Sequence, residues 1–130
     1  MATQILRQQL DALIAQCAAT EEGRQALAMY EHTVQFTPLD GDPFYLKSRG
    51  GDVTLHEGAM PETPITNAHE IKAQTEVFSQ WFGGKERMSD LIEHGQMFPV
   101  ASHTTKRHID HWLAKIVRLG NGQKVPHEVY

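Results

Sequence analysis

Residues 75–119 read TEVFSQWFGGKERMSDLIEHGQMFPVASHTTKRHIDHWLAKIVRL, and this stretch decides the fold class. Paired glycines are poor in helix interiors and common at helix ends, so Gly83-Gly84 predicts a break between two short helices. Gly95 is expected to end the second of these helices, Lys85–His94. A short strand over Met97–Ala101 should follow, and the segment therefore predicts mixed helix and strand.

A final helix is predicted over Thr105–Leu119, because its apolar residues recur at the helical period. The apolar stripe consists of Ile109, Trp112, Leu113, Ile116 and Val117. The opposite face carries Lys106, Asp110, His111, Lys115 and Arg118. One face of this helix should therefore pack on a core while the other meets water.

The first 60 residues change from a helical to a strand pattern. A helical stripe is formed by Leu6, Leu10, Leu13, Ile14 and Cys17. Thr20 is placed to cap a second helix that runs to about Tyr30. From Val34 apolar and polar residues alternate, which predicts a strand, with further strands over Phe44–Arg49 and Asp52–His56.

The three strands should form an antiparallel meander, because short turns join them. Asp40-Gly41-Asp42-Pro43 forms the first turn and Gly50-Gly51 the second. Residues Ile65–Ile71 fit either a fourth strand or a connector.

Length and charge narrow the functional classes. A chain of 130 residues can build one core, and a formal net charge of −4 provides no basic footprint for nucleic acid or anionic membrane. No apolar run approaches the roughly 18 residues of a membrane span, and the first ten residues do not have the pattern of a secretory signal. The single cysteine, Cys17, lies on an apolar stripe, so a reducing, cytoplasmic setting is expected.

The order of elements resembles the type-2 sterol carrier protein family, the non-specific lipid-transfer proteins. The resemblance covers roughly Thr33–Leu119 and rests on the ordered set, in particular on Gly84-Lys85 after an aromatic helix and on Gly95. Family members usually carry a Gly-Asp pair before the last helix, whereas this chain reads Val-Ala-Ser-His-Thr-Thr over residues 100–105. Ser102 or Thr104 could cap the helix instead.

The resemblance implies an α+β fold with an antiparallel-rich five-stranded sheet, covered by helices and enclosing an apolar tunnel. The expected organisation is an N-terminal helical region over residues 1–30 packed on the domain, a carrier-like domain over residues 31–120 and a tail over residues 121–130. The family function does not extend to the N-terminal helices. The expected function is binding or transfer of a lipid-like ligand, either fatty acyl, acyl-CoA, isoprenoid or sterol-like, without covalent chemistry, cofactor, metal or membrane insertion. A homodimer or a protein partner stays open.

Large and flexible apolar side chains provide an independent reason to expect a ligand site, because methionines and aromatic rings adapt to varied apolar shapes. The predicted ligand-binding residues are Phe36, Phe44, Trp81, Phe82, Met88, Met97, Phe98, Trp112 and Ile116. The competing interpretation is that each of these side chains simply fills the core. In that case the chain would be an accessory or interaction domain of a larger complex.

Histidines near the last helix support a third hypothesis. His103, His108 and His111 are close in sequence, with Asp110 between the last two. Imidazoles three residues apart on a helix could share a metal, and a His-Asp pair could act as a general base. However, Asp110 lies about 100° around the helix from His111, and no nucleophile motif is nearby. The sequence therefore favours a solvated face, with a small enzyme as the alternative.

Overall fold

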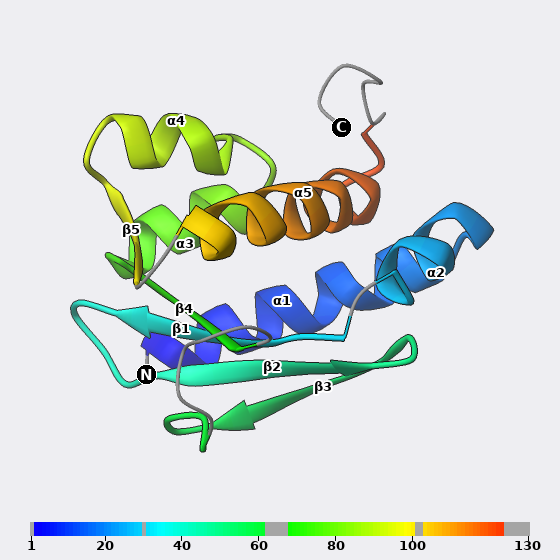
Figure 1. Cartoon of the computed structure of the whole chain (residues 1–130), viewed down its shortest axis with the longest axis horizontal. Coiled ribbons are helices and arrows are strands. Elements are labelled where there is room, and N and C mark those ends of the chain that lie inside the picture. Colours follow the sequence, from blue (N-terminus) through cyan, green and yellow to red (C-terminus); the bar gives the residue numbers. More distant parts are fainter. Residues whose placement is uncertain (1, 30, 62–67, 101–102, 124–130) are drawn as a thin grey trace.

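Helices cover one face of a five-stranded sheet in the computed structural model (Figure 1). The structure describes residues 2–29, 31–61, 68–100 and 103–123, with residue 2 and residues 103–110 described by their backbone alone. In chain order the elements are α1 (Ala2–Ala18), α2 (Glu21–Leu27), β1 (Thr33–Pro38), β2 (Phe44–Arg49), β3 (Asp52–Glu57), β4 (Ala68–Ala73), α3 (Thr75–Phe82), α4 (Met88–Glu93), β5 (Met97–Val100) and α5 (His103–Gly120). The predicted α+β class is confirmed.

The sheet has the order β3-β2-β1-β4-β5 and is mostly antiparallel. The predicted meander is present, because β2 pairs antiparallel with both β1 and β3. The uncertain segment Ile65–Ile71 is resolved in favour of a strand over its described part, since β4 begins at Ala68. This strand pairs parallel with β1. The chain that leaves β3 at one edge of the sheet must therefore cross over β2 and β1 before β4 begins.

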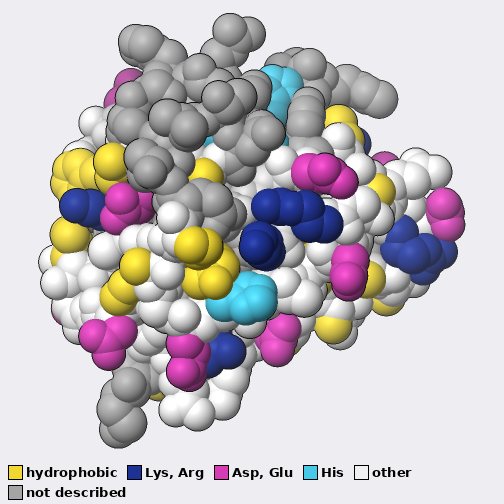
Figure 2. Space-filling model, turned by 60° about the horizontal axis from the view of Figure 1, so that its bottom comes forward, with side chains coloured by type: hydrophobic (Ala, Val, Ile, Leu, Met, Phe, Trp, Pro, Cys, Tyr) yellow, Lys and Arg dark blue, Asp and Glu magenta, His cyan; other side chains and the backbone are white. Residues whose placement is uncertain are grey.

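Alternation along the strands separates a core face from an outer face. On β1 the core face carries Val34 and Phe36, which are both fully buried. The outer face of β1 carries Gln35 and Thr37, which bond to each other and to Glu70 of β4. Figure 2 shows the face turned away from the helices, where charges of both signs are interspersed with scattered apolar side chains.

Helix ends follow the predicted signals with small shifts. The Thr20 hydroxyl accepts a hydrogen bond from Gly23 N at 3.0 Å, which confirms the predicted cap of α2. Gly84 and Gly95 have φ values of 74° and 71°, a conformation that glycine adopts without strain. Between them α4 begins at Met88 rather than Lys85, because Arg87 is extended. The last helix begins at His103, two residues before the predicted start.

The first and last helices pack directly on each other. The predicted stripe of α1 is buried at Leu6, Leu10, Leu13 and Cys17. A Cβ atom at Gly120 of α5 would lie 2.5 Å from Leu13 Cδ1 and 2.7 Å from the Leu13 carbonyl oxygen. The approach of these two helices therefore depends on the absence of a side chain at position 120.

We expect Gly120→Ala to lower the free energy of unfolding by about 1–3 kcal/mol, because the added methyl group must push α1 and α5 apart. Urea denaturation followed by circular dichroism measures this loss. Gly41→Ala is the control, since its Cβ would meet nothing closer than the Thr3 hydroxyl at 3.2 Å and Pro38 side-chain carbons at 3.6 and 4.0 Å. Alanine is a better helix former than glycine, so without a steric clash the substitution should leave stability unchanged or raise it. Either of these results would show that the fold does not require the close approach of α1 and α5.

Candidate functional site

Aromatic side chains fill the space between the sheet and α3. The ring of Phe36 lies 5.1 Å from that of Phe44, its cross-strand partner in the register of β1 and β2. It also lies 5.8 Å from the Phe78 ring and 5.4 Å from the Phe82 ring, both edge-on. Trp81 completes the cluster at 6.3 Å from Phe36. These spacings are those of rings in mutual contact, so the cluster is packed rather than hollow.

Four of the predicted ligand-binding residues thus lie together in one aromatic cluster, namely Phe36, Phe44, Trp81 and Phe82. The structure also buries Met88, Met97, Trp112 and Ile116, each only 1% exposed. Phe98 differs, because it is 47% exposed. It follows the buried Met97 along β5, so alternation directs it to the outer face, away from the interior.

A small cavity lies between the α3–α4 connection and the C-terminal half of α5. Its volume is about 40 Å³, and its apolar wall includes Trp81, Met88, Ala114 and Val117. Glu86, Arg87 and Arg118 add charged groups to the lining. Ligand pockets in proteins usually enclose about 300–1,000 Å³, so this cavity is too small for an acyl chain.

A second hollow is larger but polar. It has a volume of about 620 Å³ and lies between the start of α1 and the ends of β2 and β3. Arg7 and Glu57 in its lining form a salt bridge of 2.7 Å. Its lining of threonine, glutamine and charged residues does not suit an apolar ligand.

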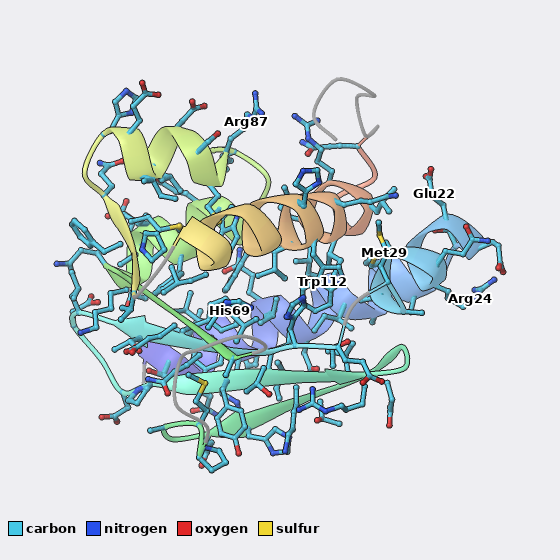
Figure 3. The ribbon with its side chains drawn as sticks, in the orientation of Figure 1. Glu22, Arg24, Met29, His69, Arg87 and Trp112 are labelled. Carbon is cyan, nitrogen blue, oxygen red and sulfur yellow. The ribbon has the colours of Figure 1, made fainter. Side chains whose placement is uncertain are left out.

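A buried histidine pair lies on the core face beneath α5, and sequence reasoning missed it. His32 Nδ1 and His69 Nε2 are 3.2 Å apart and share a hydrogen bond. The His32 ring lies 5.5 Å from the ring of Trp112, whose indole N–H donates to the Ala26 carbonyl at 2.9 Å. Figure 3 shows His69 and Trp112 in the layer between α5 and the sheet. Trp112 thus contacts this pair and the end of α2, and it does not line the small cavity.

A signal for the pair was present in the sequence. His32 lies two residues before Val34, and His69 lies two residues before Ile71. Side chains two residues apart point to the same face of a strand, so both imidazoles lie on the core face once β1 and β4 are known to be neighbours. That adjacency could not be read from the sequence, because the parallel pairing joins distant segments.

The predicted histidine cluster is described only in part. The side chains of His103, His108 and Asp110 lie outside the described residues, while His111 is exposed. The described residues contain no group of three or more His, Cys, Asp or Glu side chains placed to hold a metal ion. Burial raises the pKa of the Cys17 thiol to about 11, so this cysteine is a protonated core residue at neutral pH rather than a nucleophile.

Comparison with solved structures identifies the architecture. A crystal structure of sterol carrier protein 2 superposes with a TM-score of 0.59 at 13% identity, covering 89% of this chain and 95% of that protein. The fold is that of sterol carrier protein 2. The apo form of sterol carrier protein 2 from Yarrowia lipolytica matches with a TM-score of 0.53 at 13% identity, covering 87% of this chain and 89% of its own.

A third match places a similar unit within a longer protein. The inverting sec-alkylsulfatase Pisa1 from a Pseudomonas species has a TM-score of 0.55 and 14% identity over 68% of this chain, and the match spans 14% of that protein's length. The sequence matches no protein-family model and no curated protein sequence. No helix in the described part of the chain has the length and apolar character needed to cross a membrane.

We expect Trp112→Phe to reduce the free energy of unfolding by about 1–3 kcal/mol. The substitution removes the hydrogen bond to Ala26 and leaves space beside His32. Chemical denaturation followed by circular dichroism provides the measurement. Unchanged stability would contradict a role of Trp112 in fixing α5 to α2.

Proposed function

We propose that the protein binds a lipid-like hydrophobic ligand against the inner side of α5. The ligand classes are fatty acyl, acyl-CoA, isoprenoid or sterol-like, and the chemistry is non-covalent. The observation that carries this proposal is the small cavity, whose apolar wall of Trp81, Met88, Ala114 and Val117 continues into the aromatic cluster. The similarity of the fold to sterol carrier protein 2 structures supports a hydrophobic ligand.

Binding requires this cavity to enlarge, and α4 is the element best suited to move. This helix spans only Met88–Glu93, and two of its residues, Met88 and Leu91, are buried against the core. Gly84 and Gly95 flank it in positive-φ conformations, where glycine allows backbone adjustment. Met88 lines the cavity and carries a flexible thioether, so an incoming chain could displace it at low cost.

The driving force would be removal of the ligand from water. Each methylene buried contributes about 0.8 kcal/mol, so even a ten-carbon chain could supply roughly 8 kcal/mol before the cost of ordering. Arg87 and Arg118 at the same cavity would suit a polar or anionic head that stays near solvent.

The direct test is to identify what the purified protein carries. Organic extraction followed by mass spectrometry should release a hydrophobic molecule, and a fluorescent fatty acid should bind and be displaced by unlabelled lipid. An empty extract together with no binding of the probe would refute the carrier function.

Filling the cavity provides a residue-level test. Ala114→Leu adds three heavy atoms to a space of about 40 Å³, so we expect the affinity for the fluorescent fatty acid to fall at least tenfold while the fold is kept. Ala15→Leu is the matched control, because Ala15 is exposed on α1. Equal affinities of the two variants, measured by fluorescence titration, would place the ligand elsewhere.

A second function is favoured by two observations. First, the cavity beside Trp81 is small and the aromatic cluster is filled. Second, the unit similar to this chain in Pisa1 is a minor part of a much longer protein. Both fit an accessory domain with a collapsed interior. This alternative predicts that extraction and probe binding both fail while the native protein migrates in a complex of defined mass.

A further inference from the structure

Two side-chain amides join the end of α3 to the segment that follows α5. Asn121 Nδ2 donates to the Phe82 carbonyl oxygen at 2.9 Å, and Gln123 Nε2 donates to the Gly84 carbonyl oxygen at 3.5 Å. Phe82 is the last residue of α3, and Gly84 lies in the connection to α4. The last carbonyl groups of a helix have no partner within it, so the Asn121 amide satisfies an acceptor that α3 leaves open.

Asn121 is itself fixed to α5. Its backbone N–H donates to the Val117 carbonyl oxygen at 3.1 Å, and its side-chain Nδ2 donates to the same oxygen at 2.7 Å. A primary amide has only two N–H groups, so one serves α5 and the other serves α3. This single side chain therefore connects the C-terminal ends of two helices that are distant in the sequence.

The two segments that these amides join both line the small cavity. Trp81 and Gly84 line it from α3 and the connection to α4, whereas Val117 lines it from α5 and Gln123 from the segment beyond. A Cβ atom at Gly84 would lie 3.1 Å from both Asn121 Nδ2 and Gln123 Oε1, so the connection approaches the two amides closely. Breaking these contacts would therefore open the cavity between α5 and the connection.

The connection and α4 are held less firmly than α3. Asn121 and Gln123 are exposed, so water competes for their hydrogen bonds. The helix α4 is only six residues long, and its N-cap residue, Arg87, makes no side-chain capping bond. By contrast, α3 is anchored by its buried aromatic rings and by Gln9 of α1, whose side-chain amide donates to the Ser79 carbonyl oxygen at 2.9 Å. The connection and α4 can therefore move while α3 stays in place.

We propose that Asn121 and Gln123 form a latch that holds the α3–α4 connection against the end of α5, and that a ligand enters the cavity between these two segments when the latch opens. The entry route rests on the proposed function, whereas the latch itself does not. The latch bonds form in both the empty and the loaded protein. They therefore set the rates of ligand entry and exit rather than the affinity.

Hydrogen–deuterium exchange of the full chain without ligand tests the latch. The amides of residues 83–88 should exchange through a local opening, whose rate depends little on low urea concentrations because little surface is exposed. The amides of β1 should require global unfolding and respond strongly to urea. Asn121→Ala should speed exchange of residues 83–88 about fivefold, because one hydrogen bond that holds the closed state is lost. Gln123→Ala should have a smaller effect, since its bond is longer.

Gln25→Ala is the matched control. It removes an exposed side-chain amide from α2, where the amide bonds to Glu21 at 3.4 Å, and it should leave the exchange of residues 83–88 unchanged. Equal exchange of these residues in Asn121→Ala and the wild type would overturn the latch. A urea dependence as strong as that of β1 would overturn it too, because the segment would then open only when the whole protein unfolds.

Stopped-flow fluorescence with a fluorescent fatty acid tests the entry route. In Asn121→Ala the association and dissociation rates should both rise about fivefold, while Kd changes less than twofold. Faster exchange of residues 83–88 with unchanged probe rates would overturn this route of entry. A protein that binds no probe would refute the carrier function and the entry route with it, while the exchange experiment would still decide whether the latch exists.

Discussion

The packing of Phe36 against the surrounding rings is the interaction on which the rest of the fold depends. Its contact with Phe44 fixes the register of the first hairpin, because the two residues are direct partners across β1 and β2. Its contacts with Phe78 and Phe82 fix α3 over the same strands. The cluster thus fixes both the register of the hairpin and the position of α3, and removing one ring would weaken both.

The same cluster changes how the carrier architecture is understood in this chain. The family resemblance implied a tunnel, and the many aromatic and methionine side chains supported it. Their number alone does not show whether these side chains line a tunnel or fill the core. In the structure, the rings of Phe36, Phe78 and Phe82 contact one another, and the cavity beside Trp81 is small. A ligand would therefore have to compete with an existing core, so binding would depend on how easily α4 and Met88 yield.

The sequence predicted those features that arise from neighbours along the chain. The cap at Thr20, the breaks at Gly84 and Gly95 and the apolar stripe of α5 follow from local periodicity and backbone preference. The structure confirms the cap, the breaks and the part of the stripe from Trp112 to Val117, while the side chain of Ile109 lies outside the described residues. The pairing of β1 with β4 was not predictable, because it depends on a crossover that has no local pattern. The burial of His32 with His69 and the outward position of Phe98 follow only from long-range adjacency and strand register.

The close contact between Leu13 and Gly120 has a consequence for biosynthesis. These residues are separated by about 100 positions, which corresponds to roughly 5–20 s of translation at 5–20 residues per second. During that interval the apolar stripe of α1 lacks the helix that later covers part of it. The nascent chain therefore exposes that part of α1 to chaperones and to neighbouring nascent chains until α5 has been synthesised.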